Sequence, residues 1–233
     1  MTDPIAVSDP AGDPFAGILP QHRFVAFVDV LGFSSRILSD FENAFQSYKA
    51  LLEQWRTVWR PGPEIDVTIY SDAVLLTSAT LPPLTLAVNT LCFSSLMTDA
   101  LVRGGIGFGR HVEAHDLNNV YVVSEALTRA VHVEKDVSYP CVGLHDSVEV
   151  PSDWWSIPNI YRPVVHFEGR TFVNPFGAFW YRSAVGRAQI LRERHPEHHA
   201  KYDWFLRLYD SFENNVPLVP PAFVPYTAEP REP

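Results

Sequence analysis

The sequence has little cysteine and no cluster of basic residues, and each shortage excludes a class of function. Its two cysteines, Cys92 and Cys141, are too few for a disulfide framework or a four-ligand zinc site. Lys and Arg total 18 against 27 Asp and Glu, which gives a formal net charge of −9. Nucleic acids and anionic membranes attract proteins through clustered cations. The sequence therefore predicts no nucleic-acid partner, and any phosphate-containing ligand has to be held by local contacts.

The chain also lacks a secretory signal pattern and an uninterrupted membrane span. No charged stretch followed by an apolar core opens the sequence. The uncharged segment 73–98 is long enough to cross a bilayer, but Pro82 and Pro83 interrupt it and it is rich in Ser, Thr and Asn. We interpret it as a buried strand followed by a buried helix, and we expect a cytoplasmic protein with free thiols and no membrane partner.

Proline is concentrated at the two ends of the chain. Residues 1–20 and 217–233 together hold ten of the twenty prolines. Such segments bury little apolar surface and lack backbone donors. We therefore expect an extended or disordered tail over 1–20, one folded domain over 21–216 and a Pro-rich tail over 217–233. A hydrophobic content of 46% is ample for the core of that domain.

The hydrophobic pattern inside this domain predicts alternating strands and helices. The nearly continuous apolar run 24–31 is typical of a buried strand, and Gly32 interrupts it. From Phe33 to Trp59, apolar residues recur every three or four positions, which predicts one long helix. Two β-rich runs, 65–70 and 73–76, are separated only by Ser71 and Asp72, which indicates a hairpin.

The remaining segments complete the predicted fold. They are a helix (84–102), a strand (103–110), a strand (121–123), a helix (124–135), a hairpin (164–173) and two helices (177–194 and 198–214). This order predicts an α+β sandwich in which helices pack on one face of a mostly antiparallel sheet, extended by a C-terminal hairpin and helices.

Two aspartates are the first candidates for chemistry. Asp29 lies in the middle of the apolar strand, where a carboxylate is costly unless a partner neutralises it. Taken alone, it is best read as a hydrogen-bond acceptor for the following turn. Asp72, at the hairpin tip, changes this reading, because neighbouring strands would bring both carboxylates to one end of the sheet. Ligands that are all oxygens suit Mg²⁺ or Mn²⁺, so the pair predicts a divalent-cation site.

The glycine turn after Asp29 suggests a place for phosphate. Gly32, Phe33 and Ser34 open a predicted helix, where free backbone N–H groups and the helix dipole favour anions. Arg103 begins a strand expected near the hairpin and would add a local cation. The alternative for Arg103 is a solvated charge or a surface ion pair at a strand end.

Four segments resemble, in order and spacing, the strand motifs of class III nucleotidyl cyclases. They are Phe-Val-Asp-Val-Leu-Gly-Phe (27–33), Tyr-Ser-Asp-Ala (70–73), Arg-Gly-Gly-Ile-Gly-Phe-Gly (103–109) and Val-Ser-Glu-Ala-Leu-Thr-Arg-Ala (123–130). The resemblance is greatest to the pyrimidine (uridylate or cytidylate) cyclases of Pycsar antiphage defence systems, which share the first motif and the Ser-Asp hairpin. It covers residues 24–135 and implies the ferredoxin-like, or palm, fold of class III cyclases.

The resemblance also implies an activity and a ligand set. In class III cyclases the two aspartates hold two divalent metal ions, Mn²⁺ or Mg²⁺, which puts that role on Asp29 and Asp72, with the carbonyl of Val30 as a further ligand. The implied reaction converts UTP to 3′,5′-cyclic UMP and pyrophosphate, with UTP favoured over CTP. The implied assembly is a homodimer with shared sites, and the product would act on a separate effector that senses the cyclic nucleotide in antiphage defence.

Some positions depart from the family pattern. Thr128 and His132 occupy the places of an asparagine and an arginine that serve the transition state in the partner subunit's site, and Arg129 is a possible substitute. For His132 the favoured alternative is an ordinary helix histidine.

Thr68 and Tyr121 replace the purine-selecting pair and would form a pocket for a smaller base, or simply reflect strand propensity. The alternatives to a uridylate cyclase are therefore a cytidylate cyclase, a purine cyclase with an unfamiliar pocket, and an inactive cyclase-like regulator that binds nucleotide.

Overall fold

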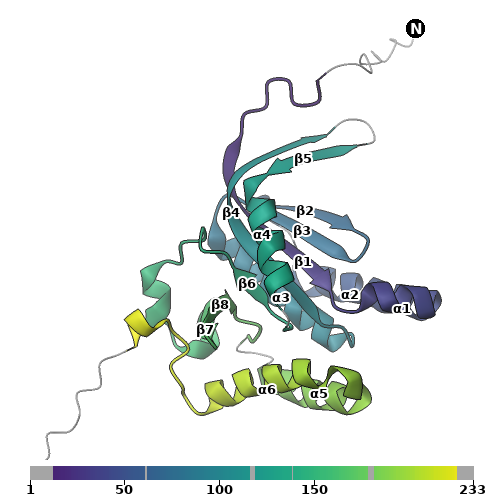
Figure 1. Ribbon diagram of the computed structural model, residues 1–233, viewed down its shortest axis with the longest axis vertical. Helices are drawn as coiled ribbons and strands as arrows, with labels where there is room; N and C mark the ends of the chain where they lie inside the picture. The colour runs from purple at the N-terminus through teal and green to yellow at the C-terminus, as the bar shows by residue number, and fades with distance from the viewer. Residues whose placement is uncertain (1–12, 61, 116–118, 138, 178–180, 225–233) are drawn as a thin grey trace, which may run out of the picture.

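A computed structural model describes residues 13–60, 62–115, 119–137, 139–177 and 181–224, and it centres on an eight-stranded sheet (Figure 1). The strands are β1 (Gln21–Val30), β2 (Ile65–Tyr70), β3 (Ala73–Ser78), β4 (Val102–His115), β5 (Val120–Ser124), β6 (Val142–Leu144), β7 (Val164–Phe167) and β8 (Arg170–Val173). The helices are α1 (Phe33–Ser39), α2 (Phe41–Val58), α3 (Leu81–Met97), α4 (Glu125–Asp136), α5 (Tyr181–Arg194) and α6 (His199–Glu213).

The strand order is β2-β3-β1-β4-β6-β8-β7, with β5 paired to β4. Strand β1 is central and runs antiparallel to both β3 and β4. The pair β4–β6 is parallel, and β6 is a three-residue strand that the sequence pattern did not predict. The α+β class and the mostly antiparallel sheet are thus confirmed, and the segment 73–98 is indeed a strand followed by a helix.

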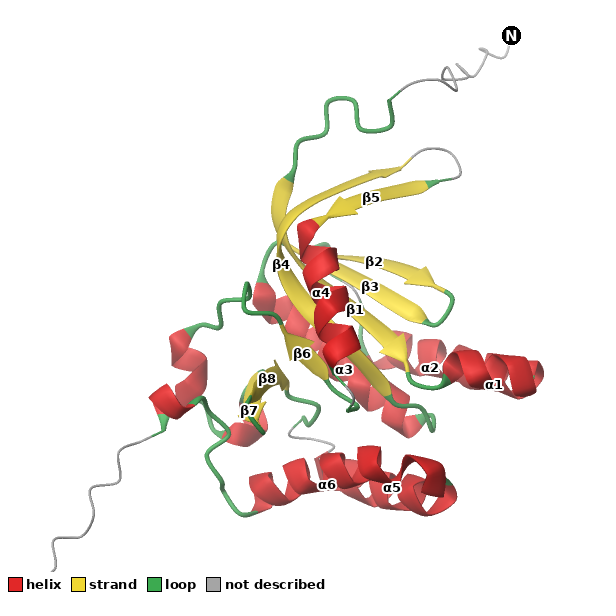
Figure 2. Cartoon of the chain, viewed as in Figure 1, coloured by secondary structure: helices red, strands yellow, loops and turns green. Residues whose placement is uncertain are grey.

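Helices cover both faces of the sheet, which corrects the prediction of a single covered face (Figure 2). Ala26 and Val28 of β1 belong to the large hydrophobic cluster that contains residues of α2 and α3. Val25, on the other face, packs with Ala126 of α4. Successive side chains of a strand point to opposite faces, so a continuous apolar run requires cover on both sides.

The long helix predicted from Phe33 is divided into α1 and α2. Asp40 separates them in an extended conformation, with φ −153° and ψ 82°. Its carboxylate accepts a hydrogen bond from the N–H of Asn43 at 3.2 Å, the usual contact of an N-terminal cap. The apolar spacing continues through this break, and for this reason periodicity alone did not reveal it.

Glycines of β4 allow α4 to approach the sheet closely. A Cβ atom at Gly105 would lie 2.2 Å from the carbonyl oxygen of Ala130, and one at Gly107 would lie 2.3 Å from that of Ala126. The helix begins where predicted, because Ser124 Oγ accepts a hydrogen bond from the N–H of Leu127 at 2.9 Å. The glycine spacing of this strand is therefore explained by helix packing.

The C-terminal hairpin and helices form a second hydrophobic cluster around Trp204 and Phe172. The folded unit extends beyond the predicted boundary at 216, because Leu218 and Val219 are buried. The carbonyl of Leu218 also accepts a hydrogen bond from the N–H of His166 at 3.0 Å. The prolines of this segment limit its backbone donors but leave its apolar side chains free to pack. Of the predicted tails, residues 1–12 and 225–233 lie outside the described part of the chain.

In the ranges that the structure describes, no helix combines the length and the apolar character needed to cross a membrane. Cys92 and Cys141 are both free thiols and both are buried. Burial raises the pKa of Cys92 to about 12, so this thiol stays protonated and unreactive at neutral pH.

Candidate functional site

The structure brings Asp29 and Asp72 together at one end of the sheet. Asp29 lies opposite Ala73 of β3, the residue that follows Asp72. The N–H of Val30 donates a hydrogen bond to the carbonyl of Asp72 at 3.2 Å, which fastens the hairpin tip to the end of β1. Ser71 adopts a positive φ of 50°, which the two-residue turn requires.

The two carboxyl groups interact strongly. Burial and the neighbouring Asp72 raise the pKa of Asp29 to about 6, although the positive charge of Arg103 acts in the opposite direction. Two adjacent carboxylates repel each other when both are ionised, unless a cation lies between them. The arrangement is therefore one that a divalent cation would stabilise.

Two buried polar atoms beside Asp29 and Asp72 make no hydrogen bond in the described part of the chain. The hydroxyl of Tyr48, from α2, and Nε of Arg103 are both buried, and neither makes a hydrogen bond within the described ranges. Tyr48 lies near Asp72, since burial and the charge of Asp72 raise the pKa of Tyr48 to about 12. Most buried polar atoms in proteins make a hydrogen bond. Two such atoms without one are typical of a site that binds a polar ligand.

Asp29, Asp72 and the backbone of Val30 fit a magnesium or manganese ion, because all their donor atoms are oxygens. Across the described parts of the chain there is no group of three or more His, Cys, Asp or Glu side chains suited to a metal. Side-chain ligation here would thus come from two aspartates, and backbone or substrate oxygens would complete it.

Arg103 is held between Asp29 and a residue that sequence reasoning missed, Glu134. Arg103 lies opposite Asp29 in the β1–β4 pairing, and its Nε is 3.7 Å from Asp29 Oδ2. Its Nη2 is 2.7 Å from Glu134 Oε1, and the Glu134 side chain is only 7% exposed. Arg103 is therefore ion-paired within the chain, and its role toward substrate phosphates stays a prediction.

The sequence pattern of α4 contained a signal that Glu134 is buried. The buried residues of α4 are Ala126, Ala130 and Glu134, spaced four apart on one stripe of the helix. A charged residue on an otherwise apolar buried stripe indicates a buried partner of opposite charge. That partner, on β4, could be identified only once the strand and helix were placed against each other.

Glu134→Gln is expected to lower the free energy of unfolding by roughly 1–3 kcal/mol, because the partly buried guanidinium of Arg103 would lose its closer charged partner. Denaturation in urea measures this loss. Glu125→Gln is the matched control, because Glu125 lies on the same helix and pairs with Arg110, but the two side chains are 39% and 63% exposed. Glu125→Gln should lower the free energy of unfolding clearly less than Glu134→Gln does. Equal losses in the two variants would contradict the structural importance of the Arg103–Glu134 pair.

The turn after Asp29 differs from the expected phosphate cradle. Gly32 has a φ of 73° and precedes α1, which has only seven residues. Phe33 is buried, with its ring centroid 5.1 Å from that of Tyr48, and Ser34 is exposed. A helix of this length has a smaller dipole than the long helix predicted. A phosphate-binding role for Gly32, Phe33 and Ser34 remains a prediction.

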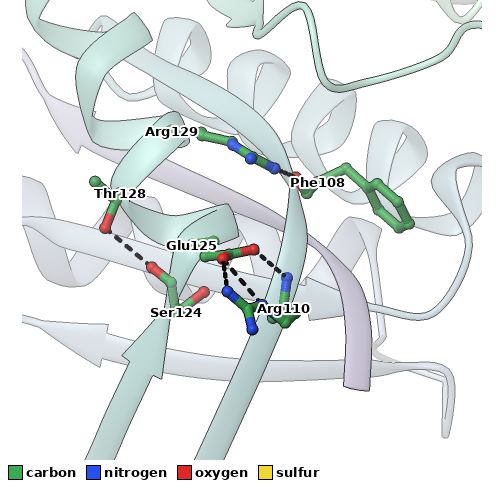
Figure 3. A network of polar contacts seen from close by, with 6 residues as sticks. All are labelled: Phe108, Arg110, Ser124, Glu125, Thr128 and Arg129. Atoms are coloured by element: carbon green, nitrogen blue, oxygen red, sulfur yellow. Dashed lines mark hydrogen bonds and ion pairs between the residues drawn. The ribbon is translucent and has the colours of Figure 1, made fainter. Parts of the chain in front are cut away.

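The candidate transition-state residues lie on α4 and make other contacts within the chain (Figure 3). Thr128 Oγ1 donates to the carbonyl of Ser124 at 3.0 Å, inside its own helix. Arg129 Nη1 donates to the carbonyl of Phe108 at 2.5 Å, across the surface of β4. His132 is exposed and lines a cavity of about 1040 Å³ between α4 and the C-terminal hairpin. Their predicted role in a partner's site stays a prediction.

The two predicted base-pocket residues have different surroundings within one chain. Thr68 lines a pocket of about 550 Å³ with Arg23, Asp66 and His111. Tyr121 is paired with Ala114 near the far end of β4, and its ring lies 6.1 Å from that of Phe15. Tyr121 does not line the Thr68 pocket, although residues 111–113 and 115 of β4, which pair with β5, do line it.

Comparisons with known proteins give distant structural similarity only. No protein family matches the chain, and no curated protein matches it. A class III adenylyl cyclase-like ATP-binding protein from Pseudomonas aeruginosa aligns with a TM-score of 0.49 and 9% identity, over 72% of this chain and 40% of that one. A bacterial light-regulated adenylyl cyclase aligns with a TM-score of 0.45 and 15% identity, over 74% of this chain and 99% of that one. The guanylyl cyclase Cya2 aligns with a TM-score of 0.44 and 11% identity, over 69% and 95%.

Proposed function

We propose that this protein is a metal-dependent nucleotidyl cyclase that converts UTP to 3′,5′-cyclic UMP and pyrophosphate. The observation that carries the proposal is the meeting of Asp29 and Asp72 beside Arg103 at one end of the sheet. This is the pair of carboxylates that the motif resemblance assigns to metal; Asp29 lies in β1, and Asp72 lies in the turn between β2 and β3.

The reaction forms a bond between the ribose 3′-oxygen and the α-phosphorus, and it breaks the bond from that phosphorus to the leaving pyrophosphate. Bound Mg²⁺ or Mn²⁺ would supply charge neutralisation and would acidify the 3′-hydroxyl. The chain itself positions the groups: Asp29 and Asp72 hold the cation site, and Arg103, fixed by Glu134, presents a guanidinium to the phosphates.

The choice of base and the biological setting come from the motif resemblance. It favours UTP over CTP, a homodimer with shared sites, and a role in antiphage defence through a separate effector. On the same resemblance, Thr68 and Tyr121 are the residues proposed to contact the base.

A nucleotide-binding regulator without cyclase activity is the second candidate. A specific observation favours it: Thr128 and Arg129 are engaged within their own chain, by the carbonyls of Ser124 and Phe108. A cyclase lacking a free donor for the transition state would bind a nucleotide without turning it over. The paired aspartates count against this candidate, because binding alone does not need two adjacent carboxylates.

Incubating the purified protein with Mn²⁺ and each of UTP, CTP, ATP and GTP, followed by mass spectrometry of the products, tests both candidates. We expect cyclic UMP and pyrophosphate in equal amounts, no product with EDTA, and less product from the other nucleotides. Cyclic CMP as the main product would shift the base assignment. Nucleotide binding with no cyclic product from any base would support the regulator and overturn the cyclase.

A further inference from the structure

The Thr68 pocket lies at the other end of β1 from Asp29, where β4 pairs with β5 (Figure 1). Its volume of about 550 Å³ is in the range of small-molecule sites. Four neighbouring strands supply its polar side chains. They include Arg23 of β1, Asp66 and Thr68 of β2, Thr77 of β3, and His111 and Glu113 of β4.

The strand register places the polar side chains of β1 and β4 on one face of the sheet. Arg23 lies opposite Gly109, and His111 is two positions further along β4. Residues that face each other across a pair, or alternate along a strand, point to the same face. Val25, two positions after Arg23, packs with Ala126 of α4. The pocket is therefore on the face of the sheet that α4 partly covers.

His111 is the buried polar group of this pocket. Its side chain is only 5% exposed, and neither ring nitrogen makes a hydrogen bond within the ranges that the structure describes. Burial lowers the pKa of His111 and outweighs the carboxylates of Glu113 and Asp66, which raise it, while Arg23 adds to the lowering. The ring is therefore neutral at neutral pH, with one donor and one acceptor nitrogen. A buried imidazole without hydrogen bonds is typical of a site that binds a polar ligand.

Glu113 places an acceptor beside His111. Its Oε2 lies 3.5 Å from His111 Nε2, and its side chain is 16% exposed. The other carboxylate oxygen, Oε1, is 2.6 Å from His115 Nε2, which holds the carboxylate in place. Because Glu113 favours the ring tautomer with its proton on Nε2, the pair presents an N–H donor next to an anionic acceptor.

Arg23 brings a second donor to the same pocket. A guanidinium carries five N–H groups, and one of those on Nη2 of Arg23 donates to Gln21 Oε1 at 2.8 Å. Two donors and one acceptor complement an imide, in which an N–H lies between two carbonyl groups. Uracil carries this group. Cytosine has an acceptor nitrogen in place of the imide N–H, and that nitrogen would face the carboxylate of Glu113.

We propose that this pocket binds the imide edge of a planar heterocycle such as uracil, with His111 and Arg23 donating to the two carbonyls and Glu113 accepting from the N–H between them. The uracil group can come from the UTP substrate or from a separate ligand. Within one chain the pocket and Asp29 lie at opposite ends of β1, so the pocket serves the substrate only in a dimer with shared sites. The link to UTP therefore rests on the proposed function, whereas the binding of uracil does not.

Titration calorimetry of the full chain with uridine and with cytidine, without metal, tests the site without turnover. We expect uridine to bind at least about tenfold more tightly than cytidine. Glu113→Gln should remove this preference, because an amide donates as well as accepts. His111→Phe should weaken uridine binding about tenfold or more. Equal affinities of the wild type for the two nucleosides, or no binding of uridine, would overturn the proposal.

Two measurements separate binding from folding. Glu149→Gln is the matched control for Glu113→Gln, because Glu149 is an exposed glutamate in the loop after β6, and it should bind uridine as the wild type does. His111→Phe should melt at the same or a higher temperature, because an apolar ring replaces a buried imidazole that makes no hydrogen bond in the described chain. Loss of uridine binding in a folded variant then reports on the ligand.

Enzyme kinetics distinguishes the two sources of the uracil group. If it is the base of the substrate, uridine competes with UTP, and Glu113→Gln raises KM for UTP more than KM for CTP. If it belongs to a separate ligand, uridine does not compete with UTP. Uridine binding that depends on Glu113, with no cyclic product from any nucleotide, would keep the site and overturn the cyclase. Cyclic UMP formation with uridine affinity unchanged in both pocket variants would overturn the site and keep the cyclase.

Discussion

Replacing Asp29 or Asp72 with asparagine is expected to reduce cyclic nucleotide formation by about 10²–10³-fold or more, because each variant removes one of the two charged oxygen ligands of the cation site. Initial rates with Mn²⁺ and UTP measure the loss. Asparagine keeps the size of the side chain and an oxygen, so a loss of rate reports on charge and ligand strength.

The same two variants should remain folded. The pKa of Asp29 is raised to about 6, so its ionised form, which prevails at neutral pH, destabilises the folded state relative to the unfolded chain. Asp29→Asn should therefore melt at an equal or higher temperature without metal. It should also lose the stabilisation that Mn²⁺ gives the wild type.

Asp146→Asn is the control, since Asp146 is an exposed aspartate in the loop after β6. It should leave the rate and the response to metal unchanged. A rate close to that of the wild type in either Asp29→Asn or Asp72→Asn would remove the carboxylate pair from the mechanism.

The carboxylate pair could be predicted from the sequence because its determinants are local. Asp29 interrupts an apolar strand, and only two residues separate the strands that flank Asp72. Once β3 pairs with β1, both side chains lie at the same end of the sheet. The hairpin limits were predicted for the same reason, but the helix predicted over 84–102 spans Leu81–Met97 in the structure.

The rest of the site could not be predicted because it depends on contacts distant in sequence. Glu134 pairs with Arg103 although 31 positions separate the two residues in the sequence. The spacing of apolar residues indicates which side of α4 or α6 is buried. It does not indicate which strand packs against that side. The break at Asp40 was hidden for the opposite reason, since a local capping contact can interrupt a helix without disturbing its apolar spacing.

Gly105→Ala is expected to lower the free energy of unfolding by roughly 2–3 kcal/mol or more, because the added methyl group meets backbone that cannot rotate away. A Cβ atom at this position would lie 2.2 Å from the carbonyl oxygen of Ala130 and 2.7 Å from Cβ of Val133. Only a displacement of α4 from β4 relieves both contacts. Denaturation in urea measures the loss.

Gly186→Ala is the matched control, because Gly186 lies within α5 and a Cβ atom there would meet nothing within 4 Å. This substitution should stabilise the protein by up to about 1 kcal/mol, since alanine favours a helix over glycine. If Gly105→Ala lowers and Gly186→Ala raises the free energy of unfolding, close packing against α4, and not backbone flexibility, explains the glycine at position 105. Equal stability of Gly105→Ala and the wild type would contradict it.

The Gly105→Ala variant should also lose activity in proportion to the movement of α4. Ala130 and Glu134 are one turn apart on the same buried stripe, so a helix pushed away at Ala130 carries Glu134 away from Arg103. Arg103 would then turn toward Asp29, now its nearest carboxylate, and would compete with the cation for that ligand. Raising the Mn²⁺ concentration should restore part of the rate in this variant, and should restore none in Asp29→Asn, where the ligand itself is gone. Full activity of a destabilised Gly105→Ala protein would show that the glycine strand and the metal site are independent.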